Sequence, residues 1–239
     1  MKPAFYALRP GGWRDYVTLL HLPYTAWHLS YVVIGGCLAP VVAWGRLGAA
    51  VAAFALAVGV GAHALDERHG GPLETRIPRA VLVGLAAGSI AAACAVGIVG
   101  ALTVAPWLAL LVPVGLFLVL AYNLELLQGR FHTDLWFGLA WGGFPVICGY
   151  AACAGRIGAT AVVAAGFAVA LTLAQRTLSA HAKRIRRDTT RVEGFVEFRD
   201  GGRLQLDEAA LIATSERALE LLAAATVTLA LALVVARLS

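Results

Sequence analysis

Two consecutive apolar stretches determine the fold: AVLVGLAAGSIAAACAVGIVGALT at residues 80–103 and PWLALLVPVGLFLVLAYNLEL at residues 106–126. An α-helix needs about 20 apolar residues to cross the hydrocarbon core of a bilayer, and each stretch supplies that length. Only Val104 and Ala105 separate the two stretches. We therefore predict two transmembrane helices that are joined in a tight hairpin.

The rest of the chain has the same character, because 60% of the 239 residues are hydrophobic and only 14% are charged. Soluble domains contain about half apolar and about a quarter charged residues. Five further stretches are long enough to span a membrane, at residues 17–43, 47–66, 134–154, 158–182 and 208–237. We predict an all-α, polytopic transmembrane bundle of about seven helices, forming a single domain over residues 1–239.

Basic residues lie mainly on one side of this predicted bundle. The connection after the sixth span carries the largest group, which is Lys183, Arg184, Arg186, Arg187, Arg191, Arg199 and Arg203. The opposite side carries only Arg46, Arg156 and Arg237. The positive-inside rule then predicts a multi-pass protein of the plasma (inner) membrane, with a cytoplasmic N-terminus and an external C-terminus. Because topology explains the basic loop, we expect no nucleic-acid partner.

The connection between the sixth and seventh spans, residues 187–207, is the longest and is predicted to be a cytoplasmic insertion. Apolar residues alternate on both sides of Asp200-Gly201-Gly202, a pattern typical of a β-hairpin. We expect this short hairpin to lie as a cap over the cytoplasmic mouth of the bundle. A solvated linker is the alternative, since two strands alone are only marginally stable.

Ionisable and polar side chains gather at three span ends on the predicted cytoplasmic side. Such residues are costly in a membrane and are functional candidates by default. The second span ends with His63, Asp66 and Glu67, which share one helical face at spacings of three and four. A second group, Tyr122, Asn123 and Glu125, ends the fourth span and is followed by Arg130. A third group, Gln175, His181, Lys183 and Arg184, ends the sixth span. We expect one shared site.

The order of these motifs resembles the UbiA superfamily of intramembrane prenyltransferases. An Arg9-Pro10 start precedes the first span, and the second span ends in an acidic motif. The segment PLETRIP at residues 72–78 is similar to the basic segment of that family, and GLAWGGFP at residues 138–145 to its glycine- and proline-containing helix. The likeness covers about residues 5–190, and it implies a UbiA-like bundle.

The resemblance also implies roles for individual residues. Asp66 and Glu67 are expected to hold Mg²⁺ and, with His63, to form the catalytic group. Arg76, Tyr122, Arg130, Lys183 and Arg184 are expected to bind the diphosphate of an isoprenoid substrate. The remaining pocket residues are expected to be Asn123, Glu125, Gln175 and His181.

The motifs depart from the family pattern, so the chain is interpreted as a divergent member with degenerate Asp-rich motifs. In the family's N-x-x-x-D-x-x-x-D motif, Ala62 stands at the first position and Gly70 at the last, and only Asp66 is kept. The second acidic motif is replaced by HAKRIRR at residues 181–187. Fixed cations can neutralise a leaving diphosphate as Mg²⁺ does. We therefore expect basic residues to replace part of the magnesium site.

Two other functions stay open. The chain has His, Asp and Glu residues that suit zinc or iron, which predicts a membrane metalloenzyme. The loss of family carboxylates instead favours a non-catalytic relative that binds an isoprenoid or another lipid. Two further histidines, His21 and His28, lie seven residues apart in the first span on either side of Pro23. We expect His28 not to face the bundle interior, since no partner for it is evident.

Overall fold

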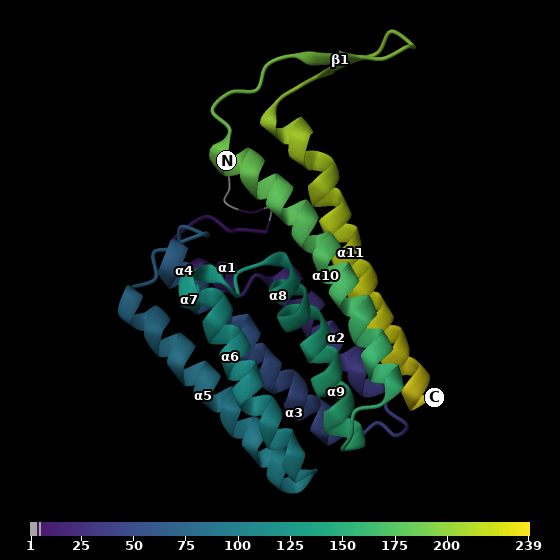
Figure 1. The fold of residues 1–239 in the computed structure, drawn as a ribbon. Coiled ribbons are helices and arrows are strands. Elements are labelled where there is room, and N and C mark those ends of the chain that lie inside the picture. Colours follow the sequence, from purple (N-terminus) through teal and green to yellow (C-terminus); the bar gives the residue numbers. More distant parts are fainter. Residues whose placement is uncertain (1–3, 5) are drawn as a thin grey trace.

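The chain folds almost entirely into helices, and the computed structural model describes residue 4 and residues 6–239 (Figure 1). Two π-helical segments and one 3-10 helix join some of the α-helices, and one antiparallel hairpin interrupts the helical order. In chain order the elements are α1 Trp13–Leu19, α2 Leu22–Cys37, α3 Trp44–Phe54, η1 Ala55–Ala62, α4 His63–Gly70, α5 Arg79–Thr103, η2 Pro106–Leu110, α6 Leu111–Asn123, α7 Leu126–Gly129, α8 Asp134–Gly138, η3 Leu139–Gly143, α9 Phe144–Ala154, α10 Ala159–Asp188, β1 Phe195–Glu197, β2 Arg203–Gln205 and α11 Glu208–Leu238.

Six continuous helical stretches among the described residues are long and apolar enough to cross a membrane. They agree with six of the predicted spans to within a few residues, and they are 44–70, 79–103, 106–123, 134–154, 159–188 and 208–238. The prediction of a multi-pass helical membrane protein is confirmed at this level. In the stretch 44–70, η1 continues α3 into α4, and in 134–154, η3 continues α8 into α9.

The seventh predicted span, 17–43, is not one continuous helix. His21 adopts a left-handed conformation with φ of 45° and separates α1 from α2. The following α2 has 16 residues, which corresponds to about 24 Å of helix. Pro23 lies in its first turn, where a proline costs little because the backbone N–H there needs no partner within the helix.

Although it is short, α2 is the central helix of the bundle. The side chains of Trp27, Tyr31 and Val32 have no exposed surface. Ten of the 16 residues of this helix are buried. Its main neighbours are α9 and α11.

Glycines bring α2 and α9 into backbone contact. A Cβ atom on Gly149 would lie 2.0 Å from the carbonyl oxygen of Val32, and one on Gly35 would lie 2.1 Å from that of Val146. No larger residue fits at either position without moving the helices apart. Small residues permit such close packing in membrane proteins, where dispersion contacts between helices replace the hydrophobic driving force.

The helical hairpins lie on opposite sides of α2, with α5 and α6 on one side and α10 and α11 on the other (Figure 1). The last turn of α11 is tied to the end of α2, because the guanidinium of Arg237 donates to the carbonyl oxygens of Cys37, at 2.8 Å, and Ala39, at 3.0 Å. A cation at a helix C-terminus satisfies carbonyl groups that have no partner within the helix.

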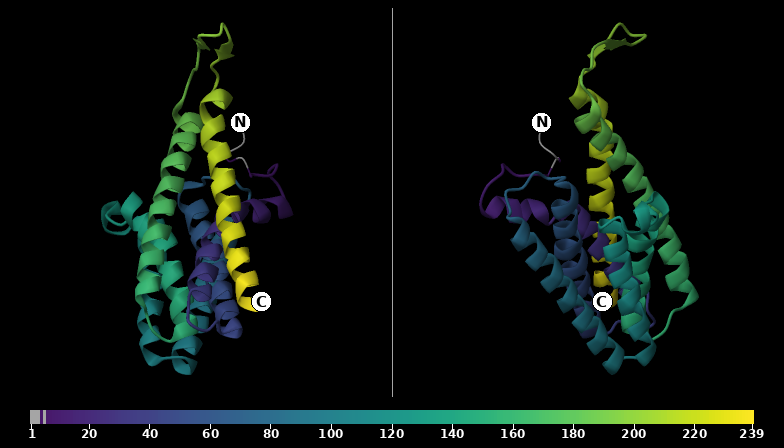
Figure 2. Two further views of the ribbon diagram at one scale, coloured as in Figure 1. Left: turned by 90° about the vertical axis from the view of Figure 1, so that its right-hand side faces the viewer. Right: turned by 60° about the vertical axis from the view of Figure 1, so that its left-hand side comes forward.

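The predicted hairpin exists, and its position corrects one expectation. Val196 pairs with Leu204 in antiparallel register, and the turn contains Asp200-Gly201-Gly202. All six strand residues are exposed. The hairpin stands beyond the ends of α10 and α11, away from the other helices (Figures 1 and 2). The prediction of a cap over the bundle is therefore wrong, because the two long helices carry the hairpin past the rest of the molecule.

Substitution of Gly149 by alanine is expected to destabilise the bundle. The new methyl group would overlap the Val32 carbonyl, and overpacking of this kind costs about 1–3 kcal/mol. A thermal melt of the purified protein in detergent would measure the loss as a lower Tm. Gly84→Ala is the matched control, since no atom lies within 4 Å of a Cβ at that position. An equal Tm for the two variants would contradict the close packing of α2 on α9.

Candidate functional site

Polar side chains gather at one end of the bundle, which we call the polar end. They include Asp15 of α1, Tyr24 of α2, Asp66 of α4, Tyr122 of α6 and Lys183, Arg186 and Arg187 of α10. In Figure 1 this is the end of the bundle at which α4 and α7 are labelled. The π-helical segment Ala55–Ala62 precedes His63 and sets the direction of the residues that follow. Gly59 and Gly61 let this wide segment pack closely on Thr25 and Ile90. π-Helical turns are rare and occur frequently at functional sites.

Glu67 holds the loop that follows α4. Its side chain is buried, and its two carboxylate oxygens accept hydrogen bonds from the backbone N–H groups of Leu73, at 2.9 Å, and Thr75, at 2.7 Å. Both oxygens therefore have backbone donors. This arrangement gives Glu67 a structural role in holding the loop.

A second buried carboxylate, Asp15, holds the same loop from the other side. Its Oδ2 accepts from the backbone N–H of Arg76 at 3.1 Å, and its Oδ1 accepts from that of Gly11 at 2.8 Å. Asp15 thereby ties the N-terminal segment and α1 to the segment at residues 72–78. The sequence does not point to Asp15, because a single acidic residue near the N-terminus carries no signal of a distant partner.

Asp66, the neighbour of Glu67, faces a cationic helix instead. Lys183 and Arg187 of α10 interact with it electrostatically, as does His132. Arg187 also donates a 2.7 Å hydrogen bond to the carbonyl oxygen of Pro72, so the end of α10 lies against the loop after α4. The structure thus brings Asp66 close to Lys183 and Arg187.

A stack of aromatic rings lies beside this charged group. The rings of His21 and His63 are parallel within 12° with centroids 4.1 Å apart, and the Tyr6 hydroxyl is hydrogen-bonded to Nδ1 of His21 at 2.8 Å. Nδ1 of His63 donates to the carbonyl oxygen of Gly59 at 3.2 Å. Burial raises the pKa of the Tyr6 hydroxyl above its ordinary value, and Tyr24 and Asp66 act in the same direction. Tyr6 is therefore a neutral hydroxyl at physiological pH.

Tyr122 forms the third part of the polar end, at the end of α6. Its ring stacks on His132 with centroids 4.4 Å apart, and Nδ1 of His132 donates to the Tyr122 carbonyl oxygen at 3.0 Å. Phe137 and Trp141 lie against the same ring at 5.5 and 6.0 Å. The Tyr122 hydroxyl also interacts electrostatically with Asp66.

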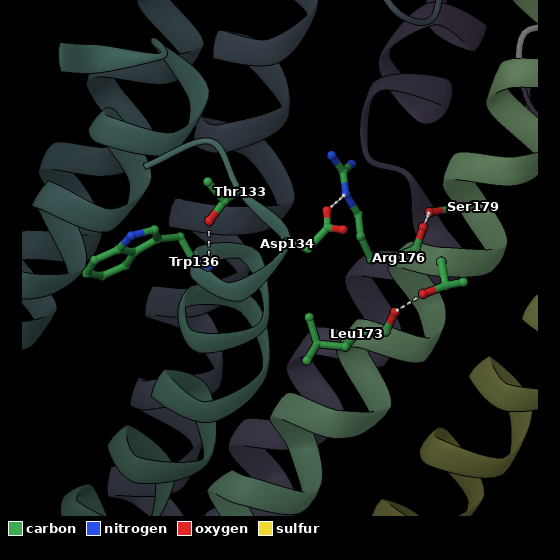
Figure 3. Close-up of polar contacts among 7 residues, drawn as sticks. Thr133, Asp134, Trp136, Leu173, Arg176 and Ser179 are labelled. Atoms are coloured by element: carbon green, nitrogen blue, oxygen red, sulfur yellow. Dashed lines mark hydrogen bonds and ion pairs between the residues drawn. The ribbon is translucent and has the colours of Figure 1, made fainter. Parts of the chain in front are cut away.

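An ion pair joins α8 to α10 at the edge of the polar end (Figure 3). Nε of Arg176 donates to Asp134 at 3.0 Å, and its guanidinium lies 5.3 Å from the centre of the Phe137 ring. The neighbouring Thr133 hydroxyl accepts from the backbone N–H of Trp136 and caps α8. Arg176 thus positions α8 and its aromatic residues relative to α10.

A further ion pair, between Arg186 of α10 and Glu216 of α11, joins the two longest helices. Both side chains are largely buried. Arg186 also interacts electrostatically with Tyr6 and Tyr24, so it belongs to the polar end. Breaking a largely buried pair is costly when it leaves one charge uncompensated. This pair therefore fixes the spacing of α10 and α11.

An apolar cavity of about 600 Å³ lies between α3, α5, α6 and α9. Trp141 and Val119 lie at its inner end, and Arg46 and Val104 lie at the opposite end. Val119 is one helical turn from Tyr122, and Trp141 contacts the Tyr122 ring. The inner end of the cavity is therefore adjacent to the polar end.

The remaining predicted site residues are more scattered. Asn123 is buried and its Nδ2 donates to the Val119 carbonyl, and Gln175 is buried with Oε1 lacking a hydrogen-bond partner. His181 is exposed and lies 3.4 Å from the Leu211 carbonyl. Arg76, Glu125, Arg130 and Arg184 are exposed, as is Lys183.

His28 overturns another expectation. It is buried, and its Nδ1 donates to the carbonyl oxygen of Trp141 at 2.8 Å. The expectation that it faces away from the interior is wrong because its partner is a backbone atom 113 positions away. The α-helical donor to that oxygen is missing, because the residue four positions later is Pro145, which has no backbone N–H.

Within residue 4 and residues 6–239, no group of three His, Cys, Asp or Glu side chains is placed to hold a metal ion. The carboxylate that remains at the polar end, Asp66, lies beside cations. A magnesium ion is usually bound by one or two carboxylates together with substrate phosphates. Glu67, the second carboxylate of the predicted pair, already accepts two backbone hydrogen bonds from the loop.

Comparison with known proteins adds no family. No protein-family model, no curated protein and no solved structure matches the chain.

Replacement of Glu67 by alanine is expected to release the loop at residues 71–78. Hydrogen bonds to a charged group contribute about 1.5–3 kcal/mol each, and the variant loses two of them. Hydrogen exchange at the Leu73 and Thr75 amides would accelerate. Glu74→Gln is the control in the same loop, because Glu74 is exposed. Unchanged protection at both amides in Glu67→Ala would contradict the structural role.

Proposed function

We propose that the chain is a UbiA-like membrane prenyltransferase that binds an isoprenoid diphosphate, with the diphosphate at the polar end and the tail in the apolar cavity. The adjacency of a cationic group to an apolar cavity supports this function. Lys183 and Arg187 supply positive charge beside Asp66, while Val119 and Trp141 connect this end with the cavity. An amphiphile with an anionic head and a long tail matches both parts.

The proposed chemistry depends on charge neutralisation by side chains. As the bond between the first prenyl carbon and the diphosphate oxygen breaks, the electron pair leaves with the diphosphate. Lys183 and Arg187 stabilise that anion through charge-assisted hydrogen bonds. The aromatic faces of Tyr122 and Trp141 stabilise the positive charge on the prenyl group. The acceptor then bonds to that carbon and loses a proton.

The basic residues thus take the part that carboxylate-bound Mg²⁺ has in the UbiA superfamily. The resemblance to that superfamily rests on the order of motifs, and the proposal assigns no step to a metal ion. Arg76, Arg130 and Arg184 stand outside the group formed by Asp66, Lys183 and Arg187, and their proposed role is to attract the diphosphate toward the polar end.

The second candidate is a protein that binds an isoprenoid or another phosphorylated lipid without reaction. The structural role of Glu67 favours it, because the acidic motif then has little left for catalysis. The metalloenzyme is the weaker alternative, since the described residues contain no three-ligand group.

Purified protein mixed with geranylgeranyl diphosphate is expected to bind it and, with a suitable acceptor, to release diphosphate. Lys183→Ala should weaken binding by about tenfold or more, as expected for loss of a charge-assisted contact. Asp66→Ala should preserve binding. Release of diphosphate by the unaltered protein supports the enzyme, whereas binding without release supports the second candidate. Dependence of release on added Mg²⁺ would contradict neutralisation by side chains alone.

The proposed orientation places the polar end and the hairpin in the cytoplasm of a cell bounded by the plasma (inner) membrane. The basic loops favour this orientation. A cysteine at Gly201, in the hairpin turn, should react with a membrane-impermeant maleimide only after the membrane is opened. A cysteine at Arg156, in the opposite connection, should react in intact cells. The reverse pattern would invert the proposed topology.

A further inference from the structure

The first helix lies differently from the spanning helices. In both views of Figure 2, the purple helix at the N-terminal end runs across the direction of the long helices and projects to the side of the bundle. This helix, α1, has seven residues, which corresponds to about 10 Å at about 1.5 Å per residue. It is therefore too short to cross the hydrocarbon core of a bilayer.

Asp15 holds α1 at the level where two spanning stretches end. Its Oδ2 accepts a hydrogen bond at 3.1 Å from the backbone N–H of Arg76. Arg76 lies in the loop that connects the spanning stretches 44–70 and 79–103. Because that loop leaves one span and enters the next, it lies at the boundary of the hydrocarbon core, and α1 lies beside it.

The residues that precede α1 fold back onto the same helix. The backbone N–H of Leu8 donates to the Thr18 hydroxyl at 3.1 Å, and that of Gly11 donates to Oδ1 of Asp15 at 2.8 Å. These bonds fix the segment before α1 at the same boundary.

The two faces of α1 differ in character. Asp15, Thr18 and Leu19 are buried, and their spacings of three and four place them on one face. Trp13 and Tyr16 lie on the other face and are 67% and 43% exposed. Rings of this size are unfavourable in water, whereas Trp and Tyr are enriched in the headgroup layer, where the ring meets acyl chains and its polar atom meets water.

Basic side chains lie around this aromatic pair. Arg9 and Arg14 are exposed on the same segment, and Arg79 is exposed at the start of α5. The guanidinium of Arg14 lies 5.7 Å from the centre of the Trp13 ring, so cation and ring share one surface. Arginines beside apolar rings match a layer in which anionic headgroups cover acyl chains.

We infer that α1 is an in-plane membrane anchor that binds the headgroups of anionic phospholipids. Its cations are Arg9, Arg14 and Arg79, and its aromatic residues are Trp13 and Tyr16. The rings lie among the upper acyl chains, and the guanidinium groups pair with lipid phosphates. This interaction surface goes beyond the proposed function and does not depend on the reaction.

The depth of α1 in the membrane tests its position. A nitroxide is attached to Tyr16→Cys, in full-length protein whose four native cysteines are replaced by alanine, in vesicles of phosphatidylcholine and phosphatidylglycerol. It should collide more often with oxygen, which dissolves in acyl chains, than with a water-soluble nickel chelate. Val196→Cys, on the exposed hairpin, is the matched control and should be freely accessible to nickel.

Two outcomes of this measurement would overturn the anchor. Equal access of nickel to residues 16 and 196 would place α1 in water. Shielding of residue 16 from both reagents would place its aromatic face against protein, such as a second copy of the chain.

The choice of lipid is measured with the native cysteines in place. Trp13 fluorescence, identified by its loss in Trp13→Phe, should be quenched more strongly by brominated phosphatidylglycerol than by brominated phosphatidylcholine. Arg14→Gln should raise the fraction of phosphatidylglycerol needed for half quenching by about fivefold, as expected for loss of one cation at the membrane surface.

Arg203→Gln is the matched control for this substitution. Arg203 is also an exposed arginine over an aromatic ring, that of Phe195, but it lies on the hairpin. It should leave the quenching of Trp13 unchanged, and thermal melts should show that both variants are folded. Equal quenching by the two brominated lipids, or equal effects of Arg14→Gln and Arg203→Gln, would refute a preference of α1 for anionic headgroups.

Discussion

The backbone contact between α2 and α9 is the constraint on which the rest of the structure depends. Glycines at 35 and 149 allow these helices to approach until a methyl group no longer fits between them. This contact places α2 at the centre of the bundle, although it is too short to match the other spans. Because α2 is central, His21 and His28 lie in the interior, and the polar end has a fixed inner wall.

The transmembrane spans were predictable because hydrophobic length is a local property of the chain. Residues 80–103 needed only their own composition to be identified as a span, and the hairpin around Asp200-Gly201-Gly202 needed only its alternation and turn residues. The break at His21 was not predicted. It depends on a left-handed backbone conformation, and no glycine marks that position in the sequence.

The candidate site was predictable only in part, for a related reason. Helical periodicity and alternate span ends brought Asp66, Tyr122 and Lys183 to the same end of the bundle. The different roles of Asp66 and Glu67 depend on a loop that turns back toward α4, so that backbone N–H groups meet one carboxylate and α10 meets the other. Side-chain contacts with distant backbone atoms, such as that of His28 with Trp141, leave no sequence pattern.

The π-helical segment at residues 55–62 has a consequence for how this chain tolerates changes in length. A π-turn contains one residue more than an α-turn, so it shifts the angular phase of every residue that follows. Loss of one residue would restore α-helical winding, and each residue corresponds to about 100° around the helix axis. His63, Asp66 and Glu67 would then rotate together toward other neighbours. An insertion or deletion in this segment therefore rotates the side chains of the polar end about the helix axis. In the exposed hairpin, by contrast, a change in length alters nothing that the other helices contact.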